Sequence, residues 1–429
     1  MMKLQQLIQD MCPNGVEWKP FSELGIFYGG LSGKNKDDFK DGNAKYITYL
    51  NIGCNPALRL DILETVKIDP NEKQNKVQYG DALFTGSSET PDECAMSSVV
   101  IEQPTEDIYL NSFCFGFRFN SLDGICPAFY KHYFRSDAFR KTVRRTANGT
   151  TRFNVSKKEF SKLEIPIPPL EIQKKIVECL DKFSALAAEL QAELQMELQM
   201  RRKQYEYYRT QLLTPHSDCN SATKSDDCNW EWKTLGELCV SIKDGMHNLP
   251  ASSLEETDYP IISAQNIFDN KIDYIAKRYV EKATYEKENK RTNVEVGDVL
   301  LTIVATIGRS AVVTDNRPVL LQRSVCVLKP SEKIYPKFLK YSLDTNRVQS
   351  YMLANAHGAA QAGLYLNQVE QIKIALPPLK EQKRIADLLE KFDKLITSME
   401  DGIPAEQAAQ QKRYEYYRDL LLTFDRKAV

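Results

Sequence analysis

The chain contains one long stretch twice, and this duplication limits the folds that it can adopt. Residues 165–214 and 374–423 align from end to end at an offset of 209 residues, with 21 identities in 50 positions. An internal repeat of this length indicates two copies of one structural unit. The aligned pairs include Pro168 with Pro377, Phe183 with Phe392, Tyr205 with Tyr414 and Arg209 with Arg418.

Both copies have the pattern of a long α-helix. A Pro-Pro pair stands at each start, where proline is tolerated because the first helical N–H groups have no intrahelical partner. Apolar residues then recur at steps of three and four, which places them on one helix face. A lone helix of this kind is unstable in water, so we expect the two copies to pack on each other. Gly402-Ile403-Pro404 predicts a kink or a short break in the second copy. The stripe of the first copy comprises Ile176, Leu180, Phe183, Leu186, Leu190, Leu194, Leu198, Tyr205, Tyr208 and Leu212.

A globular segment precedes each helix. In residues 15–164, the first head, β-like runs such as Tyr46–Leu50 and Phe113–Phe119 alternate with turn residues, and a helical stretch is expected from about Pro127 to Val143. This alternation is typical of an α/β or α+β domain. The expected boundaries are 1–165 for the first globular domain, 166–214 for the first long helix, 215–229 for a linker, 230–374 for the second globular domain, 375–423 for the second long helix and 424–429 for a tail.

Residues 230–373, the second head, repeat the first head weakly. The spacing between matching landmarks drifts by a few residues, so the heads are expected to share a scaffold and to differ in their loops. The long helices are much more alike, which predicts one shared partner for the helices and two different targets for the heads. Antiparallel helices would relate the halves by a pseudo-twofold axis. The landmarks are Glu17-Trp18-Lys19 with Glu231-Trp232-Lys233, Asn51-Ile52 with Asn266-Ile267, Gly80-Asp81 with Gly297-Asp298, Ser112-Phe113-Cys114 with Ser324-Val325-Cys326, and Gly149 with Gly358.

Composition excludes several classes of protein. The 57 basic and 58 acidic side chains nearly cancel, so any nucleic-acid surface must be local. No run of eighteen apolar residues and no signal-peptide core are present, which predicts a cytoplasmic protein without a membrane span. Ten cysteines without a CxxC pair and only four histidines favour reduced structural cysteines over a metal site.

The chain carries no recognisable catalytic motif. The Gly-rich stretch from Tyr28 to Asn35 lacks the glycine spacing of a phosphate-binding loop, and Asn35 stands where Ser or Thr would bind magnesium. Methyl transfer to a base amine would need an Asn/Asp-Pro-Pro-aromatic motif, but the only Pro-Pro pairs follow Ile and Leu. We therefore expect a non-catalytic protein.

A basic cluster near the end of the first head is the strongest candidate for nucleic-acid contact. Ten basic side chains between Ser121 and Leu163 face only three acidic ones, and aromatic residues are interleaved. Arginine and lysine at this density suit phosphate contacts, and arginine also binds guanine edges. The alternative is a solvated helix face. The candidates are Lys131, Arg135, Arg140, Lys141, Arg144, Arg145 and Arg152, with Lys157, Lys158 and Lys162 beside them.

The loops after the entry strands are the second set of candidates. Glycine lets the backbone approach a phosphate or a base, and small polar side chains can follow it. An ordinary turn explains these residues equally well. The candidates are Ser32, Gly33 and Lys34 in the first head, and Asp244, Gly245 and His247, with Arg309 and Arg323, in the second head.

The duplicated Tyr-Glu-Tyr-Tyr-Arg segments of the long helices are candidates for a subunit interface. Their first and third tyrosines continue the apolar stripe, whereas the middle tyrosine points elsewhere. Either a partner or solvent covers the middle residue. The interface candidates are Tyr207, Arg209, Tyr416 and Arg418.

Twin PPL-x-x-Q-[KR]-x-I helix starts, twin K-[QR]-YEYYR-x-x-LLT helix ends and two divergent heads resemble the specificity subunit of type I restriction–modification enzymes. The resemblance covers essentially the whole chain. It implies two target recognition domains that each read half of a bipartite DNA site, joined by an antiparallel coiled coil of the two long helices. His247 and the Asp244-Gly245 turn match a loop of these domains, from which Ser32-Gly33-Lys34 departs.

The resemblance also implies the partners. Double-stranded DNA, two methyltransferase subunits and, through them, restriction and translocase subunits are expected in a prokaryotic cytoplasm. S-adenosylmethionine, ATP and Mg²⁺ are expected on those partner subunits and no cofactor on this chain. The alternative function is a dumbbell-shaped protein–protein adaptor that does not touch DNA, and a third is a self-sufficient methyltransferase.

Three tandem tetrads in the first long helix resemble a feature of some family members. They run from Ala187 to Leu198, with Leu at every fourth position. Each tetrad lengthens a helix by about 6 Å, which corresponds to one or two base pairs. The segment is either plain helical filler or a ruler for the gap between half-sites.

Overall fold

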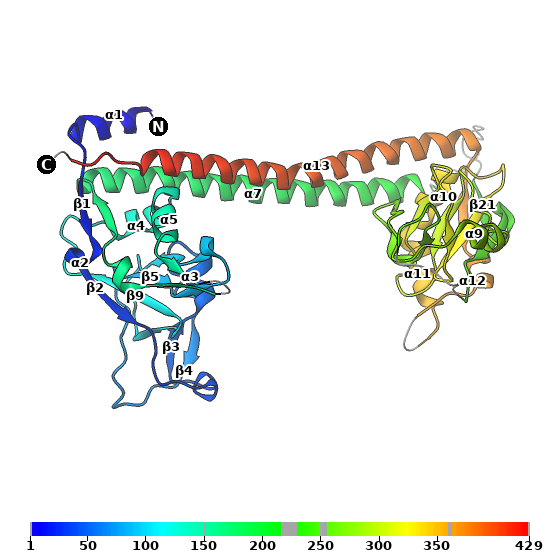
Figure 1. Cartoon of the computed structure of the whole chain (residues 1–429). Helices are drawn as coiled ribbons and strands as arrows, with labels where there is room; N and C mark the ends of the chain where they lie inside the picture. Colours follow the sequence, from blue (N-terminus) through cyan, green and yellow to red (C-terminus); the bar gives the residue numbers. More distant parts are fainter. Residues whose placement is uncertain are drawn as a thin grey trace. The chain divides into compact units, whose positions relative to one another are not determined.

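The computed structural model describes residues 2–149, 152–215, 230–248, 250, 255–358 and 362–427. The chain forms two compact units (Figure 1). Unit 1 comprises Met1–Glu193 with Ile403–Val429, and unit 2 comprises Leu194–Gly402. Each unit therefore contains one head, part of the first long helix and part of the second. The expected linker at 215–229 lies outside the described residues except for residue 215.

The duplicated stretch forms two helices of 43 residues each, α7 (Leu170–Leu212) and α13 (Leu379–Leu421). Helix α13 continues through Pro404 without interruption, so the short break expected there is wrong. Proline removes one backbone hydrogen bond from a helix. The helical turns on either side of Pro404 keep their backbone hydrogen bonds, so the helix continues through this residue.

A buried glutamine explains the repeated motif at each helix start. In unit 1, Gln173 Nε2 donates to the carbonyls of Pro168 and Gly124, both at 2.7 Å, and its Oε1 accepts from Cys126 N at 2.7 Å. Gln382 binds in the same way in unit 2. Each glutamine therefore joins the start of a long helix to the loop that precedes a head helix. The unit 2 bonds run from Gln382 Nε2 to Pro377 O (2.8 Å) and Lys333 O (3.1 Å), and from Tyr335 N to Gln382 Oε1 (2.8 Å).

Within each unit the two long helices pack antiparallel. In unit 1 the ring of Phe183 lies 6.2 Å from Tyr414 and 5.8 Å from Tyr417, centroid to centroid. In unit 2 the equivalent Phe392 packs on Tyr205 and Tyr208 at 6.3 and 5.9 Å. The expected packing of one copy on the other is confirmed in each unit. Leu186 is an exception in the predicted stripe, because its side chain is mostly exposed.

The first head is built on a four-stranded antiparallel sheet in the order β2-β9-β5-β7. Strand β5 is buried on both faces, which its Ala-Leu-Phe-Thr sequence allows. Phenylalanines from the sheet and from α4 and α5 fill the core beneath it. The elements of unit 1 before α7 are α1 (Met2–Met11), β1 (Glu17–Pro20), α2 (Phe21–Leu24), β2 (Gly25–Gly29), η1 (Lys36–Phe39), β3 (Ala44–Ile47), α3 (Tyr49–Cys54), β4 (Glu64–Val66), β5 (Ala82–Thr85), β6 (Ser87–Ser88), η2 (Pro91–Glu93), β7 (Ser97–Val99), β8 (Ile108–Leu110), β9 (Cys114–Phe119), α4 (Pro127–Tyr133), α5 (Asp137–Arg144), β10 (Ala147–Asn148), β11 (Phe153–Val155), α6 (Lys157–Phe160) and β12 (Glu164–Ile167).

The second head repeats this topology. Its four-stranded sheet has the order β14-β21-β18-β19, and its parallel pair β15–β20 corresponds to the parallel pair β3–β8 of the first head. Strands β13 and β22 form an antiparallel ribbon like that of β1 and β12. The elements of unit 2 between the long helices are β13 (Glu231–Thr234), α8 (Leu235–Leu238), β14 (Cys239–Asp244), β15 (Ile261–Ile262), η5 (Ala264–Asn266), β16 (Ile267–Phe268), β17 (Lys271–Ile272), α9 (Lys282–Glu288), β18 (Val299–Thr302), β19 (Ser310–Val312), β20 (Leu320–Leu321), β21 (Val325–Pro330), α10 (Pro336–Leu343), α11 (Asn346–Ala354), α12 (Leu366–Glu370) and β22 (Lys373–Leu376).

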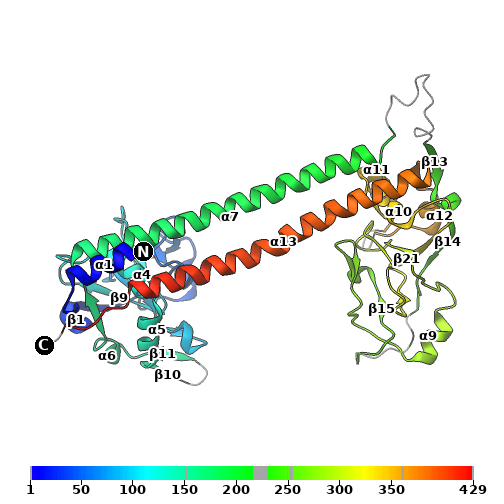
Figure 2. The ribbon, with the colours of Figure 1, turned by 90° about the horizontal axis from the view of Figure 1, so that it is seen from above.

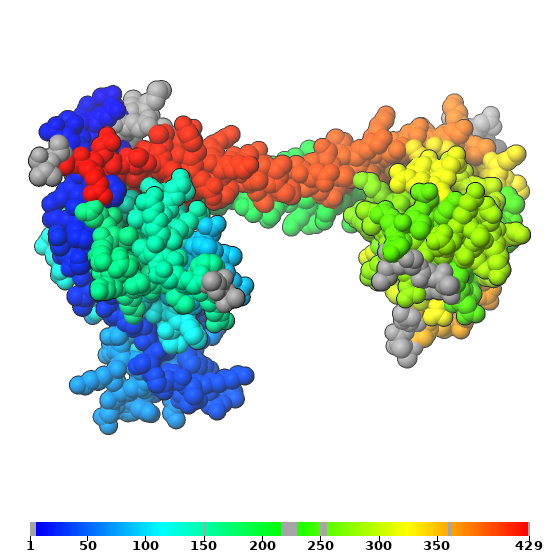
Figure 3. All heavy atoms as spheres, in the orientation of Figure 1, coloured from blue at the N-terminus to red at the C-terminus, as the bar shows by residue number. Residues whose placement is uncertain are grey.

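Two predicted elements of the first head have different bounds in the structure. The single helix expected from about residue 127 to 143 is two helices, because Ser136 caps α5 by accepting a hydrogen bond from Phe139 N. The β-like run 46–50 is divided, because β3 ends at Ile47 and Thr48 caps α3. Figures 1 and 3 show the β3 and β4 region as a projection of the first head on the side away from α7 and α13.

A short extended segment after α13 completes unit 1. The backbone N–H of Val16 donates to Asp425 O, and Lys427 N donates to Val16 O, both at 2.9 Å. Phe424 joins the core with Leu421 and Leu422, against which Leu7 and Ile8 of α1 also pack. Figure 2 shows α1 beside the start of α7 and the end of α13. Unit 1 is therefore closed by residues that follow its head by more than 200 positions.

Candidate nucleic-acid interface

The first loop of each head leaves the sheet and approaches the end of a parallel strand in the same way. The loop follows β2 in the first head and β14 in the second head. Equivalent backbone hydrogen bonds identify the corresponding residues. These bonds are Gly30 N to Cys114 O (3.2 Å) and Leu31 N to Leu110 O (2.7 Å) in the first head, and Gly245 N to Val325 O (3.0 Å) and Met246 N to Leu321 O (2.7 Å) in the second head.

This approach requires glycine. A Cβ on Gly30 would lie 1.9 Å from Asn111 O, and a Cβ on Gly245 would lie 2.2 Å from Leu321 O. No side chain fits at such distances. The glycine that corresponds to Gly245 is therefore Gly30 and not Gly33, which has a φ of +69° and open space around its Cα.

The second loop of each head is held by a buried asparagine. Asn51 Nδ2 donates to Arg59 O at 2.8 Å, and Asn266 Nδ2 donates to Asp273 O at 3.1 Å. Both side chains are buried, and each lies three residues after an N-cap residue, Thr48 of α3 or Ser263 of η5. The correspondence predicted from the sequence between Asn51 and Asn266 is therefore confirmed.

The third loop follows β8 in the first head and β20 in the second head. Asn111 N donates to Ile47 O at 3.1 Å, and Gln322 N donates to Ile262 O at 2.8 Å. The second and third loops are therefore neighbours, because each follows one strand of a parallel pair. These bonds make Asn111, Ser112 and Phe113 correspond to Gln322, Arg323 and Ser324. The pairing of Ser112 with Ser324 expected from the sequence is therefore wrong by one residue, because the sheet pairs Cys114 with Thr85 and Val325 with Thr302.

A hairpin adds a fourth loop. Val155 N donates to Gly86 O at 3.2 Å in the first head, and Leu364 N donates to Ile303 O at 2.8 Å in the second head. The tips of the two hairpins, residues 150–151 and 359–361, lie outside the described residues. We call the four loops together the loop face. It comprises residues 30–34, 48–52, 111–113, 146–149 and 152–155 in the first head, and 245–248, 263–266, 322–324, 355–358 and 362–364 in the second head.

The loop face of the second head is hollowed by a groove of about 390 Å³. Polar and basic side chains line it, while its floor is fixed by Asn266 and by a hydrogen bond of 3.1 Å from Ala264 N to Ser324 Oγ. Within the described part of the chain, the lining side chains Gln265, Gln322 and Arg323 make no hydrogen bond or ion pair. They are free to bind a ligand, as are Lys277 and Arg278 at the same groove.

The loop face of the first head presents apolar side chains instead. Leu50, which corresponds to Gln265, is 72% exposed, and Phe113, which corresponds to Ser324, is 65% exposed. Their backbones are fixed, because Tyr49 Oη donates to Ser87 O at 2.6 Å and Gly86 N donates to Phe113 O at 2.7 Å.

Three basic candidates of the first head lie inside it rather than on its surface. Arg140 donates to the carbonyls of Ala95, Asp92 and Cys94, at 2.6 to 2.7 Å. Arg135 donates to Ser97 O and Ile52 O, and Lys131 pairs with Asp181 at 2.7 Å. Burial lowers the pKa of both arginines to about 10. Their charges are held by backbone carbonyls and by Asp181 within the unit, which argues against the DNA contacts predicted for these three residues. The interleaved aromatic residues Tyr130, Tyr133, Phe134 and Phe139 are core residues as well.

The other basic candidates remain at the surface. Lys141 pairs with Asp137 at 2.5 Å and Arg144 pairs with Asp92 at 2.6 Å, so both are partly neutralised. Arg145 and Arg152 are exposed, and neither has a side-chain partner among the residues that the structure describes. Arg145 precedes the hairpin of the loop face and Arg152 lies within it, and the two are the strongest phosphate candidates of the first head.

The Ser32-Gly33-Lys34 turn is engaged within the first head. Ser32 exchanges two hydrogen bonds with the Gln74 side chain, at 3.1 and 2.8 Å. The buried Lys34 ammonium pairs with Glu72, and the hydrogen bond that it donates lowers the pKa of Glu72. Lys34 is therefore a poor phosphate contact, whereas Ser32 and Gly33 stay exposed on the loop face.

The matching turn of the second head is held by a carboxylate. The buried Asp244 accepts from His247 Nε2 at 2.6 Å and pairs with Arg291. Asp244 positions the turn, and the mostly exposed His247 remains available to a ligand.

The structure separates the two remaining candidates of the second head. Arg323 lies in the groove of the loop face. Arg309 lines a different hollow, of about 430 Å³, with Tyr205 and Arg209 of α7. Arg309 is therefore not part of the loop face.

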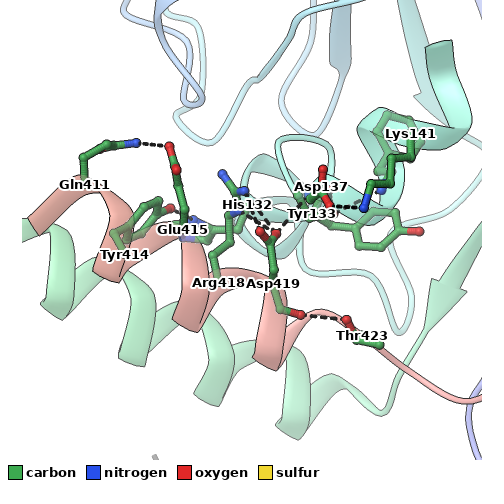
Figure 4. Close-up of polar contacts among 12 residues, drawn as sticks. His132, Tyr133, Asp137, Lys141, Gln411, Tyr414, Glu415, Arg418, Asp419 and Thr423 are labelled. Atoms are coloured by element: carbon green, nitrogen blue, oxygen red, sulfur yellow. Dashed lines mark hydrogen bonds and ion pairs between the residues drawn. The ribbon is translucent and has the colours of Figure 1, made fainter. Parts of the chain in front are cut away.

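The helix candidates also divide into two kinds. Tyr207 and Tyr416 are 61% and 64% exposed, at equivalent positions of α7 and α13. Arg209 lies over the Tyr205 ring at 5.5 Å, and Arg418 pairs with Asp419 at 3.0 Å (Figure 4). The arginines stabilise their own units, whereas the tyrosines face outward.

Sequence reasoning missed Gln265, Gln322, Lys277 and Arg278. Neutral glutamines add nothing to a charge count, and the groove depends on the pairing of β15 with β20, which are far apart in the sequence. The landmark pair Asn51 and Asn266 carried a usable signal, since it aligns Leu50 with Gln265.

No group of three or more His, Cys, Asp or Glu in the described part of the chain could hold a metal ion. No helix among the same residues is long and apolar enough to cross a membrane.

The fold and the loop faces define a two-headed repeat protein whose heads share a scaffold and differ in their exposed side chains. Residues 15–200 and 228–406 match the family described as Type I restriction modification DNA specificity domain. The chain therefore belongs to the family of type I restriction–modification specificity subunits.

Relatives and solved structures agree with this assignment. A putative type I restriction enzyme specificity subunit of Haemophilus influenzae is 34% identical over 285 residues, which cover 64% of this chain and 68% of that protein. The EcoR124I/EcoR124II specificity subunit of Escherichia coli is 32% identical over 62% of this chain and 64% of its own length. The HsdS subunit from Thermoanaerobacter tengcongensis shares the fold, with a TM-score of 0.59 at 19% identity over 96% of this chain and 97% of that one. A chain from a structure that describes complex assembly of the type I R-M system has a TM-score of 0.67 at 18% identity, over 96% of this chain and 98% of that one.

Proposed function

We propose that this chain is the non-catalytic specificity subunit of a type I restriction–modification complex, and that each head reads one half of a bipartite double-stranded DNA target. The observation that carries this proposal is the contrast between scaffold and loops. The sheets of the two heads have the same strand order, whereas the side chains at corresponding loop positions differ in chemistry. Two heads that share a scaffold but present different loop side chains are suited to bind two half-sites of different sequence.

The charges of the loop faces support contact with DNA. Lys277, Arg278 and Arg323 in the second head, and Arg145 and Arg152 in the first head, are exposed and unpaired within the described residues. Phosphate contacts place a protein on the duplex, and side chains that reach base edges supply specificity. The chain as a whole is nearly neutral, so these basic side chains supply the local positive charge that phosphate contacts require.

The long helices supply the docking surface for the enzyme subunits. Tyr207 and Tyr416 occupy equivalent positions and are similarly exposed, so two copies of one partner fit them. Aromatic side chains of this kind are frequent anchors of protein interfaces. The partners are two methyltransferase subunits, which hold S-adenosylmethionine and methylate adenine, and through them restriction and translocase subunits, which use ATP and Mg²⁺. The complex acts on DNA in a prokaryotic cytoplasm.

Methylome sequencing tests this function. Cells that express the chain with its cognate methyltransferase subunit should acquire methylated adenine in both halves of one interrupted sequence motif. Footprinting by the complex should be confined to that motif and should weaken as salt is raised. A protein–protein adaptor would give neither the motif nor the footprint, and binding of S-adenosylmethionine by the isolated chain would indicate a methyltransferase instead.

A further inference from the structure

Corresponding positions of the two loop faces carry side chains of opposite character. Leu50 stands where the second head has Gln265, and Phe113 stands where it has Ser324. Ser112, which cannot reach far, stands where the second head has Arg323. The equivalence rests on matched backbone hydrogen bonds, so these are the same places on one scaffold.

The second head is equipped to form hydrogen bonds with bases. Gln265, Gln322 and Arg323 line one groove, and each retains unused donors or acceptors within the described part of the chain. Arginine binds the O6 and N7 atoms of guanine bidentately, and glutamine binds the N6 and N7 atoms of adenine. Hydrogen bonds of Asn266 and Ser324 hold the groove floor, so the backbone beneath Gln265, Gln322 and Arg323 is fixed.

At two of the corresponding places the first head has no side chain that can form hydrogen bonds, and Asn111, which corresponds to Gln322, already accepts from Phe113 N through its Oδ1 at 2.9 Å. Leu50 and Phe113 have no polar side-chain atoms, yet most of each side chain is exposed. Scattered exposed apolar residues are ordinary on protein surfaces. These two occupy both of the loops that line the groove in the second head, and the unpaired Arg145 and Arg152 lie before and within the hairpin beside them. Among the base edges of the major groove, the thymine methyl group is the feature that apolar side chains recognise.

We propose that the two heads read their half-sites by different chemistry. The first head reads thymine methyl groups through Leu50 and Phe113, and the second head reads purine edges through Gln265, Gln322 and Arg323. This inference rests on the proposed function and adds which bases each head senses and how. The half-site of the first head is consequently rich in A·T pairs outside the methylated adenine, and that of the second head contains guanine.

Base analogues test the inference on the motif found by methylome sequencing, with the complete complex of this chain and its methyltransferase subunits. Deoxyuridine in place of thymine removes only the methyl group, and 7-deazaguanine removes only the N7 acceptor. Deoxyuridine in one half-site should lower affinity by about 4-fold for each contacted methyl group, since one buried methylene-sized group contributes about 0.8 kcal/mol. 7-Deazaguanine in the other half-site should lower it by roughly 5-fold or more.

Variants assign each effect to a head. Phe113→Ala and Leu50→Ala should bind more weakly and should no longer distinguish thymine from deoxyuridine, while their response to 7-deazaguanine is unchanged. Arg323→Met should show the reverse pattern. Ile26→Ala, at an exposed apolar position on β2 of the first head, and Arg317→Met, at an exposed basic position of the second head, should match the parent chain in both assays.

Each result decides one point. If the Phe113 and Leu50 variants still discriminate deoxyuridine like the parent chain, the apolar reading is overturned. If Arg323→Met still responds to 7-deazaguanine, the purine reading is overturned. Failure of the proposed function is distinguishable from both, because then no interrupted methylated motif exists on which to place the analogues.

Discussion

The phenol oxygen of Tyr414 lies 2.9 Å from Nδ1 of His132, so helix α13 is hydrogen-bonded to helix α4 of the first head (Figure 4). The other imidazole nitrogen, Nε2, lies 2.8 Å from Asp181 of α7. A neutral imidazole fits this arrangement, with Nε2–H donating to the carboxylate and Nδ1 accepting from the phenol. One buried histidine thus joins a head to both long helices of unit 1.

We expect this joint to weaken in acid. Burial lowers the pKa of His132 below its ordinary value of 6.5, against the opposing effect of Asp181. The unfolded chain therefore binds a proton that the folded chain does not, so the free energy of unfolding falls as pH decreases below about 6.5. Asp181 has a pKa below 3.8 despite its burial, because His132 and Lys131 donate to it, and it contributes outside this window.

Urea unfolding of the His132→Gln variant between pH 5 and 7.5 checks this expectation. The advantage of the parent chain over the variant should shrink as the pH falls. Gln191→Leu, which changes no ionisable group at an exposed position of α7, should differ from the parent chain by a constant amount. A constant difference for the His132 variant as well would show that His132 does not titrate in this range.

The glutamine at each helix start should be a site of stability rather than recognition. Gln382→Leu would leave Tyr335 N–H and two buried carbonyls without partners, at a cost of about 1–3 kcal/mol. Denaturant titration measures the loss. Gln191→Leu, at an exposed position of α7, is the matched control and should change stability by less than about 0.5 kcal/mol. Equal effects of the two substitutions would contradict the capping role of Gln382.

Arg140 and Arg145 should separate stability from DNA binding. Arg140→Met removes three hydrogen bonds to buried carbonyls and should destabilise the first head by roughly 1.5–3 kcal/mol. Arg145→Met should leave the unfolding midpoint unchanged but should reduce the salt slope of DNA binding by about 1, because one phosphate contact is lost. Thermal unfolding and salt-dependent binding measure both. If Arg140→Met lowered the salt slope and Arg145→Met lowered stability, Arg140 would be a DNA contact after all.

The tandem tetrads of α7 give a prediction about the target. Insertion of one further tetrad after Leu198 adds about 6 Å of helix, and it should widen the unspecified gap of the motif while both half-sites stay the same. Methylome sequencing of the longer variant measures the gap. A change of half-site sequence at a constant gap would make the tetrads plain helical filler.

The helices and most landmarks were predictable from the sequence because they depend on local patterns, whereas the pairing of Ser112 with Ser324 was wrong by one residue. Helical periodicity places Phe183 and Phe392 on the buried stripe, and the Pro-Pro starts and the Asn51 and Asn266 landmarks are where the repeat predicts them. Residues that act through distant partners were not predictable. A charge count cannot show that Arg140 ends among the carbonyls of residues 92–95, because that contact follows from the packing of α5 on a loop more than 40 positions earlier.

The groove of the second head was also not predictable from the sequence. Gln265 and Gln322 meet because β15 and β20 pair in parallel, and each strand is only two residues long. Such short strands leave almost no periodic pattern. The alignment of the two heads already shows that Leu50 corresponds to Gln265. Only the structure shows that both residues lie on the loop face.

The extended segment that pairs with Val16 has a consequence for synthesis. Unit 2 is one continuous stretch and can finish folding as soon as it leaves the ribosome, whereas unit 1 lacks its final core residues until Leu421, Leu422 and Phe424 emerge. At translation rates of about 5–20 residues per second, the 209 residues between the two parts of unit 1 take roughly 10–40 s to make. Throughout that interval the cluster that contains Ile172, Ile176 and Leu180 lacks Leu421, Leu422 and Phe424. The half that is translated first is therefore completed last, and it is the half that most needs protection by chaperones.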